Sequence, residues 1–423
     1  DAWFEDGAKE RFLGGLYNSD EYEQVFDILD VWFDSGSTHA FVLRDRTDGQ
    51  WPADLYLEGT DQHRGWFHSS LLQSCGTRGY APYKGVLTHG FTLDEKGMKM
   101  SKSMGNTVSP DQVIKQYGAD ILRLWVAQSD YSTDSRIGPE ILKGVSDSYR
   151  RLRNTLRFLL GSLVDYDRNI TPVEYTDMPE LEKWVLHRVC ELDEIVRHGY
   201  NEYSFQSVFQ QLFQFCTVDL SSVYFDIRKD CLYCDPENSS MRRSTRAVLD
   251  ILFFRLTSWL APILVFTSEE VWLERFGDTE TSIHLQDMPF TPKDWKNYEL
   301  SKKWDSIRKV RRVVNGAIEI QRQNKVIGSS LEAAPIVFIS DHDLFDSVMS
   351  IDFSEVCITS SVEINFGPVS EEMFKLGEIE NVGVVFALAT GDKCQRCWKY
   401  VDELGIQNDY PGICSRCSNA MEP

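Results

Sequence analysis

The sequence lacks a long apolar segment that is free of charged residues. Its longest candidate, Val248 to Phe266, carries Asp250, Arg255 and Pro262. A membrane-spanning helix needs about 20 consecutive, mostly apolar residues. We therefore expect no membrane partner and interpret this segment as a buried helix of a bundle.

The first residues, Asp-Ala-Trp-Phe-Glu-Asp, lack an initiator Met, a basic leader and the apolar core of a signal peptide. We interpret them as a cut within a larger protein. The chain also lacks internal repeats and low-complexity tracts, and its 42% hydrophobic and 26% charged residues are close to the average of folded proteins. Its 423 residues suffice for roughly two to four domains.

Basic residues are in deficit, because 44 Lys and Arg face 65 Asp and Glu and give a net charge of −21. This balance excludes a uniformly basic nucleic-acid-binding protein, although a local phosphate-facing patch can exist on an acidic chain. Two local clusters are basic, and we interpret both as phosphate-positioning surfaces; the alternative for each is a solvated charged face. The clusters are Arg150, Arg151, Arg153 and Arg157, and the eight Lys or Arg between 302 and 325.

Four regions follow one another along the chain. Residues 1–130 mix short apolar runs with Gly-rich connections, which indicates an α/β domain. Residues 131–290 are predicted to form an up-and-down helical bundle, residues 291–389 a small α+β junction, and residues 390–423 a separate unit that holds four cysteines. The predicted fold class is therefore multidomain α/β plus all-α.

Local patterns predict several elements within these regions. Ser109-Pro110-Asp111 is typical of a helix start. The apolar residues from Phe205 to Cys216 recur every three or four positions, as on one face of a helix, and the polar run 235–240 indicates a turn between two helices. Predicted strands are Ile336 to Ser340 and Val384 to Leu388.

The most specific chemical signal is Lys99-Met-Ser-Lys-Ser103, which lies between Gly97 and Gly105. Two ammonium groups three residues apart, Lys99 and Lys102, can close over a triphosphate and neutralise the charge that develops as pyrophosphate leaves. The flanking glycines allow the loop to move. The alternative is a solvated basic turn, which is the usual role of Lys and Ser in such a loop.

A second signal overlaps a short apolar run, in the segment from Tyr56 to Phe67. Open α/β sheets bind ligands at the carboxyl ends of their strands. There Glu58 or Asp61 can accept a hydrogen bond from a substrate amine. Gln62 can both donate and accept, and Gly59 permits close approach of the backbone. Taken alone, the segment could also be an ordinary polar loop.

The third signal consists of four cysteines near the end of the sequence. Cys394-x-x-Cys397 is followed after sixteen residues by Cys414-x-x-Cys417, the spacing of a tetrahedral structural zinc site without an open position. Gly412 is expected to allow a tight turn before the second pair.

The other six cysteines are predicted not to bind metal. Ten cysteines without a secretion signal favour a reducing compartment, and we expect the cytoplasm. Cys231 and Cys234 lack a partner pair at metal spacing, so we interpret them as structural or incidental. The remaining cysteines, Cys75, Cys190, Cys216 and Cys357, are predicted core residues.

These motifs together resemble one enzyme family. Lys99 to Ser103 is identical to the KMSKS signature of class I aminoacyl-tRNA synthetases. The segments 30–39, 57–66 and 87–91 resemble the catalytic core of isoleucyl-tRNA synthetases, and the terminal four-cysteine knuckle is similar to the bacterial form. The resemblance extends from Trp3 to Cys417. It implies the C-terminal half of a Rossmann-like catalytic domain, an anticodon-binding bundle, a junction and a zinc knuckle.

The resemblance also implies roles for individual residues. Lys99 and Lys102 would be catalytic, with Lys102 binding ATP. The two tryptophans that would wall the amino-acid side chain are Trp32 and Trp66, for which core packing is the alternative, while His39 is predicted to be structural. The residues that would surround the aminoacyl-adenylate are Glu58, Gly59, Asp61, Gln62 and His89.

The implied reaction activates L-isoleucine with ATP and Mg, releases pyrophosphate and loads tRNA(Ile), on a monomer with one structural zinc ion. Because an apolar pocket rejects a side chain smaller by one methylene by only about 1–3 kcal/mol, valine would enter too and an editing activity is needed. The sequence contains no His-x-Gly-His, the other class I signature, and no editing insertion. We therefore expect the chain to be inactive alone.

Two other functions stay open at this point. One is a stand-alone tRNA-binding or zinc-ribbon module that keeps the lysine loop as a relic. The other is a nucleotidyltransferase that uses the same loop on another acceptor. Isoleucine-dependent pyrophosphate exchange by the full-length parent distinguishes a synthetase from the first, and a requirement for tRNA and a branched amino acid distinguishes it from the second.

Overall fold

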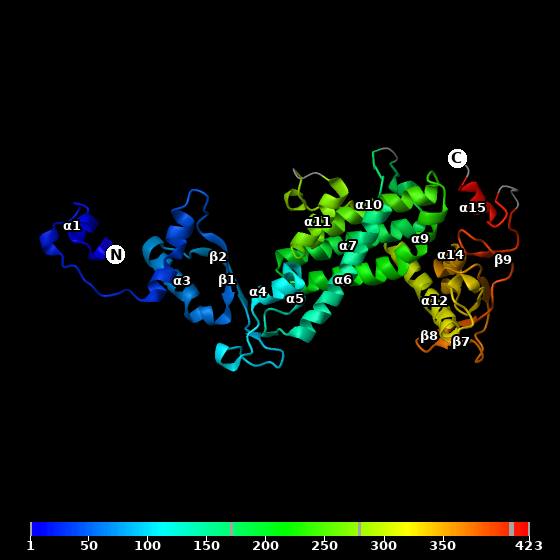
Figure 1. Cartoon of the computed structure of the whole chain (residues 1–423), viewed down its shortest axis with the longest axis horizontal. Helices are drawn as coiled ribbons and strands as arrows, with labels where there is room; N and C mark the ends of the chain where they lie inside the picture. The colour runs from blue at the N-terminus through cyan, green and yellow to red at the C-terminus, as the bar shows by residue number, and fades with distance from the viewer. Residues whose placement is uncertain (1, 170–171, 278–280, 406–409, 422–423) are drawn as a thin grey trace. The chain divides into compact units, whose positions relative to one another are not determined.

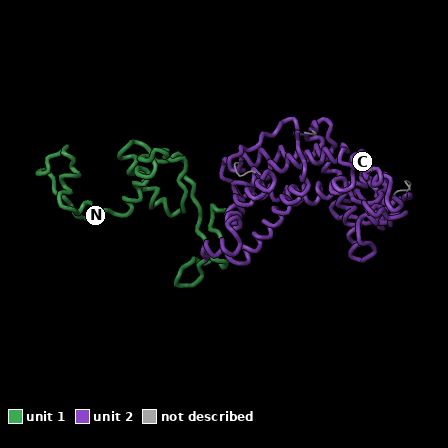
Figure 2. Tube along the Cα trace, turned by 45° about the horizontal axis from the view of Figure 1, so that its top comes forward, with its two compact units in different colours: residues 1–107, 130–137 green, residues 108–129, 138–423 purple. Residues whose placement is uncertain are grey.

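The chain folds as two compact units, which Figure 2 shows in different colours: residues 1–107 with 130–137 form unit 1, and residues 108–129 with 138–423 form unit 2. The computed structural model describes residues 2–169, 172–277, 281–405 and 410–421. Within these described residues, no helix is long and apolar enough to cross a lipid bilayer.

Unit 1 is built around two parallel strands. β1 (Ala53–Gly59) and β2 (Tyr83–His89) pair in a register that sets Gly59 beside His89. α3 (Trp66–Arg78) makes the crossover connection between them, which confirms the expected α/β type. The other elements of this unit are α1 (Ala8–Leu13), α2 (Val31–Gly36), the π-helix His39–Arg44, and the short parallel pair β3 (Thr92–Leu93) and β4 (Ser135–Arg136).

The core of unit 1 is a small aromatic cluster between β1 and α3. Tyr56 and Phe67 are buried, and the Tyr56 ring stacks on Trp66 with the centroids 4.2 Å apart. By contrast, Leu16 and Ile28 are 84% and 92% exposed. A two-stranded sheet with one crossover helix buries little apolar surface, so the order of unit 1 depends strongly on this cluster.

Unit 2 begins with a helical bundle. Its helices are α4 (Pro110–Tyr117), α5 (Ala119–Gln128), α6 (Pro139–Ser162), α7 (Glu180–Asn201), α8 (Phe205–Gln214), the π-helix Phe215–Tyr224, α9 (Phe225–Cys234), α10 (Ser240–Leu260) and α11 (Val265–Phe276). α10 packs against α6, α7, α9 and α11 (Figure 1). Val248, Leu252 and Trp259 of α10 are completely buried, so the longest apolar segment of the sequence does begin in a bundle helix, as predicted.

The helix start at Pro110 and the apolar stripe after Phe205 are also confirmed. Val208, Phe209 and Leu212 of α8 are buried, and the polar run that follows Cys234 separates α9 from α10. The π-helix between α8 and α9 was not predicted, because a pattern based on 3.6 residues per turn does not detect a wider turn.

The junction after the bundle packs a long helix, α12, against a four-stranded sheet of order β6-β5-β8-β7. The predicted strand at Ile336 is confirmed as β5. The second predicted strand, Val384 to Leu388, is largely misplaced, because the observed strand is Ile379–Val385 and shares only Val384 and Val385 with it. The elements are α12 (Tyr298–Gln323), β5 (Ile336–Ile339), α13 (His342–Met349), α14 (Phe353–Cys357), β6 (Glu363–Phe366), β7 (Phe374–Leu376) and β8 (Ile379–Val385).

The basic cluster between residues 302 and 325 lies on α12, and several of its cations face protein. Arg308 binds Asp219 of the π-helix at 3.0 Å. Arg311 is 8% exposed and donates to the carbonyl oxygens of Ser222 and Val356 at 3.0 and 2.7 Å. The expectation of a phosphate-positioning surface is therefore wrong for Arg308 and Arg311, because both arginines attach α12 to the rest of unit 2. Three further cations, Lys303, Arg312 and Arg322, pair with Glu180, Glu378 and Glu319.

A buried ion pair joins three helices of unit 2. Glu182 of α7 is completely buried, and Arg228 of α9 donates to its two carboxylate oxygens at 2.6 and 2.7 Å. The third nitrogen of Arg228 donates to Glu355 of α14 at 2.7 Å. The hydroxyl groups of Tyr224 and Thr245 also donate to Glu182. The buried carboxylate therefore accepts hydrogen bonds from Arg228, Tyr224 and Thr245, and none of its oxygen atoms lacks a donor.

Replacing Glu182 by Ala leaves the Arg228 guanidinium buried beside only one carboxylate. We expect Glu182→Ala to lower the free energy of unfolding of unit 2 by about 3–5 kcal/mol. Urea unfolding followed by tryptophan fluorescence measures this loss. Glu319→Ala is the matched control, because the Glu319–Arg322 pair is about half exposed and should cost less than about 1 kcal/mol. Equal unfolding midpoints for the two variants would contradict the assignment.

Candidate functional site

Lys99 and Lys102 lie in an exposed loop of unit 1 that follows β3. Lys99 forms an antiparallel bridge with Leu93, and Lys102 begins the 3-10 turn Lys102–Met104, which ends at Gly105 with φ of 67°. Both lysine side chains are exposed, and neither ammonium group forms an ion pair with another described residue. The two positive charges are therefore free to meet an anion.

Asp94 and Asn106 hold the backbone of this loop. The Asn106 amide donates to Asp94 at 2.9 Å and to the Lys99 carbonyl at 3.2 Å, and its oxygen accepts from the Ser101 N–H at 2.9 Å. Asp94 also accepts from the Met98 N–H at 2.7 Å. The hydrogen bond from Asn106, followed by that from Met98, lowers the pKa of Asp94. Asp94 was not among the predicted site residues, although an Asp three residues before a Gly indicates such a turn.

The carboxyl ends of β1 and β2 bring Glu58, Gly59 and His89 together. Glu58 Oε1 lies 3.8 Å from His89 Nε2 and accepts the Gly59 N–H at 3.0 Å. A side chain at Gly59 would come within 2.6 Å of the Asp61 carboxylate, so Asp61 would have to move to accommodate it. The strand end is thus a compact polar surface made by adjacent strands.

Asp61 and Gln62 follow directly, in the 3-10 turn Thr60–Arg64 that leads to α3. Gln62 Nε2 donates to Asp61 at 3.2 Å, and Gln62 Oε1 accepts the Trp66 N–H at 3.0 Å. Gln62 therefore satisfies one free N–H group in the first turn of α3 and is fixed in orientation by it. The five residues expected around the adenylate all lie in this part of unit 1.

Trp66 and Trp32 lie on either side of Gly65. The Trp66 indole N–H donates to the Ser35 carbonyl at 3.0 Å and to the Thr38 hydroxyl at 3.1 Å, which fixes the ring. One face of Trp66 is covered by Tyr56. A side chain at Gly65 would come within 2.7 Å of the Trp32 ring, which itself is 46% exposed. Trp66 thus packs against the core on one face, while Trp32 is available from solvent.

Two single-residue expectations in unit 1 have different outcomes. His39 is 3% exposed, and burial lowers its pKa, so it is a buried residue as predicted. Cys75 is exposed on α3, so its assignment to the core is wrong. Because α3 borders a small core, one face of the helix stays in contact with solvent. Cys190, Cys216 and Cys357 in unit 2 are buried as expected.

The four cysteines of the C-terminal knuckle form a cluster that fits a zinc ion. All four are buried free thiols, and their sulfur atoms lie within 4.8 Å of one another. The Cys397 and Cys414 sulfur atoms are 3.8 Å apart. Four sulfur ligands at the usual zinc distance of about 2.3 Å are separated by about 3.8 Å in a tetrahedron. A single structural zinc ion would therefore be held by Cys394, Cys397, Cys414 and Cys417.

The pKa shifts of the four-cysteine cluster differ in direction: burial raises the pKa of Cys397 and Cys417, whereas the pKa of Cys394 is lowered. Burial alone would raise its pKa, but N–H groups of Cys397, Cys414 and Arg396 bond to the sulfur and lower the pKa to about 6. The Cys414 N–H lies 3.3 Å from this sulfur. Gly412 serves this arrangement through a close approach, because a side chain there would come within 2.6 Å of Gln395.

Two arginines attach the knuckle to the C-terminal end of α9. Arg396 and Arg416 each precede the second cysteine of their pair. Arg416 binds Asp230 at 2.6 Å and Asp235 at 2.7 Å. Arg396 donates to the carbonyl oxygens of Tyr233 and Cys234 at 3.1 and 2.5 Å, where an α-helix leaves carbonyl groups without partners. The repeated Cys-x-Arg-Cys pattern was visible in the sequence but was not interpreted.

Cys234 lies closer to the knuckle than expected. The prediction that Cys231 and Cys234 are not ligands is consistent with the four-cysteine group found among the described residues. Cys234 is nevertheless buried in one cluster with those four cysteines, with Ile413 packed against it. It is therefore part of the surface on which the knuckle rests.

Three family models match successive parts of the chain. They are tRNA synthetases class I (I, L, M and V) at residues 1–138, the anticodon-binding domain of tRNA ligase at residues 182–337, and the zinc finger found in FPG and IleRS at residues 391–420.

Curated relatives match over the whole chain. An isoleucine–tRNA ligase of Ruegeria pomeroyi is 61% identical over 423 residues, and one of Brucella abortus is 53% identical over 422 residues. Each alignment covers 100% of this chain but 43% of the relative, so the chain spans about two-fifths of their length. Among solved structures, one match is LeuRS of Agrobacterium radiobacter in a ternary complex with tRNA and LeuAMS. Its TM-score is 0.52 and its sequence identity is 16%, over 65% of this chain and 34% of that chain. This likeness shows a shared fold.

The zinc assignment predicts one zinc ion per chain. We expect Cys397→Ser to lose this ion and to expose residues 390–423 to protease, because the knuckle has few other interactions that hold it folded. Atomic absorption and limited proteolysis measure the two effects. Cys234→Ser is the control and should keep the ion. Loss of zinc from the Cys234 variant as well would show that the ligand set is wrong.

The arginine contacts predict that the knuckle can loosen without losing zinc. Arg416→Ala removes hydrogen bonds to two carboxylates, each worth about 1.5–3 kcal/mol at most. We expect amide exchange in α15 (Ser415–Asn419) to accelerate by about 10- to 100-fold. Hydrogen exchange with mass spectrometry measures this rate. Arg312→Ala, which removes an exposed pair with Glu378, should leave it unchanged. An unchanged rate in the Arg416 variant would rule out the attachment.

Proposed function

The chain belongs to the isoleucine–tRNA ligases, of whose length it spans 43%, and we propose that it contributes the lysine loop, the tRNA-binding bundle and the zinc knuckle to such an enzyme. The complete protein would activate L-isoleucine with ATP and Mg, release pyrophosphate and transfer the aminoacyl group to tRNA(Ile). The observation that carries this proposal is the pair of free ammonium groups, Lys99 and Lys102, on a loop with a fixed backbone.

The two lysines would act on the phosphates of ATP. As the bond to pyrophosphate breaks, negative charge grows on the leaving group, and a nearby ammonium group stabilises that charge more than it stabilises the ground state. Gly97 and Gly105 have φ of 82° and 67°, a backbone region that other residues rarely adopt. These glycines would supply the turns at the two ends of the loop, so that its lysine side chains can reach the triphosphate.

The strand ends of β1 and β2 would hold the activated amino acid. Glu58 and Asp61 supply carboxylates for the ammonium group of isoleucine, and Gly59 lets the ligand approach the backbone. His89 and Gln62 supply hydrogen bonds to the nucleotide part. Trp32, together with the uncovered face of Trp66, would form the wall against the branched side chain.

The other regions would bind tRNA. We assign residues 1–130 to the catalytic part, 131–290 to the anticodon-binding bundle, 291–389 to the junction and 390–423 to the knuckle. The knuckle would help to present the acceptor end of tRNA. Ten free thiols support a reducing compartment such as the cytoplasm, and we propose that the enzyme acts there as a monomer.

The role of Lys102 can be tested in the full-length parent enzyme. We expect Lys102→Ala to lower isoleucine-dependent pyrophosphate exchange by about 100- to 1,000-fold, because a preorganised charge on the leaving group is lost. Lys96→Ala, in the neighbouring turn, is the control and should retain exchange. Wild-type exchange that does not depend on isoleucine, or full exchange in the Lys102 variant, would refute the proposal.

A further inference from the structure

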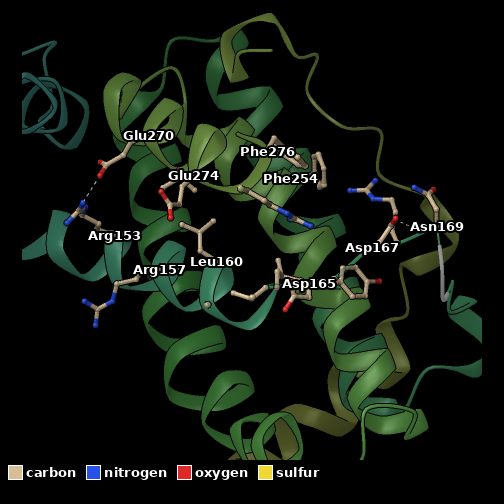
Figure 3. A pocket seen from close by; sticks show the side chains of 17 residues that line it. Arg153, Arg157, Leu160, Asp165, Asp167, Asn169, Phe254, Glu270, Glu274 and Phe276 are labelled. Atoms are coloured by element: carbon tan, nitrogen blue, oxygen red, sulfur yellow. Dashed lines mark hydrogen bonds and ion pairs between the residues drawn. The ribbon is translucent and has the colours of Figure 1, made fainter. Parts of the chain in front are cut away.

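Unit 2 contains a cavity of about 930 Å³ that none of the synthetase motifs lines. It lies between α6, α10, α11 and the loop 163–169, and Figure 3 shows it from close by. Sites for small ligands usually measure about 300–1,000 Å³. The cavity is therefore large enough for a nucleotide-sized group.

One wall of the cavity is made of flat side chains. The Phe254 and Phe276 rings lie next to each other, with centroids 5.7 Å apart (Figure 3). The Arg168 guanidinium lies 4.1 Å over Phe254, and that of Arg275 lies 5.3 Å from each of the two rings. Unpaired RNA bases stack on aromatic rings and guanidinium planes of this kind.

Arg275 also offers an unused donor. One of its terminal nitrogens pairs with Asp250, while Nη1 is buried and has no hydrogen-bond partner among the described residues. Because Nη1 is shielded from solvent, a ligand in the cavity could satisfy this N–H only if the Arg275 side chain turned toward it. Phosphate and base oxygens are suitable acceptors.

The charges around the cavity are balanced, and this argues against a bare polyphosphate. Carboxylates and an amide line it beside the arginines, so a purely anionic ligand would meet repulsion. A nucleobase presents donors as well as acceptors on its edges and suits such a mixed surface. Arg157 forms no ion pair with another described residue, and it remains available for one phosphate. The charged lining residues are Arg153, Arg157, Arg168 and Arg275, with Asp165, Asp167, Glu270 and Glu274.

Gly161 of α6 lines the cavity and leaves space above the helix. A Cβ atom there would have no heavy atom within 4 Å, and the backbone is not in the left-handed region. Gly144 of the same helix is equally open, so the lack of packing does not by itself mark a site. At Gly161 the open space belongs to the cavity and lets a ligand approach the helix backbone.

We propose that this cavity binds one unpaired nucleotide of the tRNA, with its base against the Phe254–Phe276 wall and its phosphate near Arg157. The inference rests on the proposed tRNA function and adds a site to it. Arg153 is less available than Arg157, because it is paired with Glu270 at 3.0 Å (Figure 3).

The test uses the full-length enzyme and a tRNA(Ile) transcript, with filter binding and 2′-hydroxyl acylation of unpaired nucleotides. Gly161→Leu should fill the cavity, weaken tRNA binding about 10-fold and expose one nucleotide that wild type protects. Gly144→Leu is the matched control: it lies in the same helix, and a Cβ there also meets nothing within 4 Å. Thermal melting verifies that both variants fold.

A second pair of variants tests the same site without adding bulk. Arg157→Gln should weaken binding and expose the same nucleotide, whereas Lys115→Gln, an exposed cation on α4, should keep the wild-type pattern. Wild-type protection in both Gly161→Leu and Arg157→Gln overturns the cavity proposal while leaving the tRNA function intact. Absence of any tRNA binding by wild type would instead refute the proposed function itself.

Discussion

The buried contact between Arg228 and Glu182 is the constraint on which the arrangement of unit 2 depends. Removing two charges from water costs several kcal/mol for each ion, so such a pair persists only when every hydrogen bond is made. In this pair, the Glu182 carboxylate accepts two hydrogen bonds from the Arg228 guanidinium and two from hydroxyl groups. Because Arg228 also binds Glu355, the same guanidinium connects the bundle to α14 of the junction.

Arginine is used in the same way at other contacts between elements of this acidic chain. Arg311 fixes α12 to the π-helix, and Arg416 fixes the knuckle to α9. A guanidinium group suits such positions because it stays charged and donates several hydrogen bonds in one plane. The number of Lys and Arg residues in the sequence therefore overstates how much positive surface is open to phosphate. The positive surface that remains available to RNA is local.

Much of the fold could be predicted from the sequence, and the reasons for the errors are physical. The start at Pro110, the stripe after Phe205 and the four-cysteine cluster follow from local patterns, which depend on neighbouring residues alone. Arg308 was misinterpreted because its partner, Asp219, lies in a segment that only the folded chain brings close. Glu58, Asp61 and Gln62 stood out by their place at a strand end, and the resemblance added His89. Asp94, by contrast, has no signature beyond an ordinary turn.

The lysine loop illustrates how a site can be ordered and still keep its charges free. An aspartate so close to two lysines could simply have paired with them, which would have neutralised the charges that a triphosphate needs. Asp94 instead accepts hydrogen bonds from the Asn106 amide and from backbone N–H groups, and these neutral donors lower its pKa more than the charge of Lys96 does. The carboxylate thus fixes the backbone, while the Lys99 and Lys102 side chains make no competing ion pair with the described residues. The loop is preorganised in its main chain, and its side chains are left to respond to the ligand.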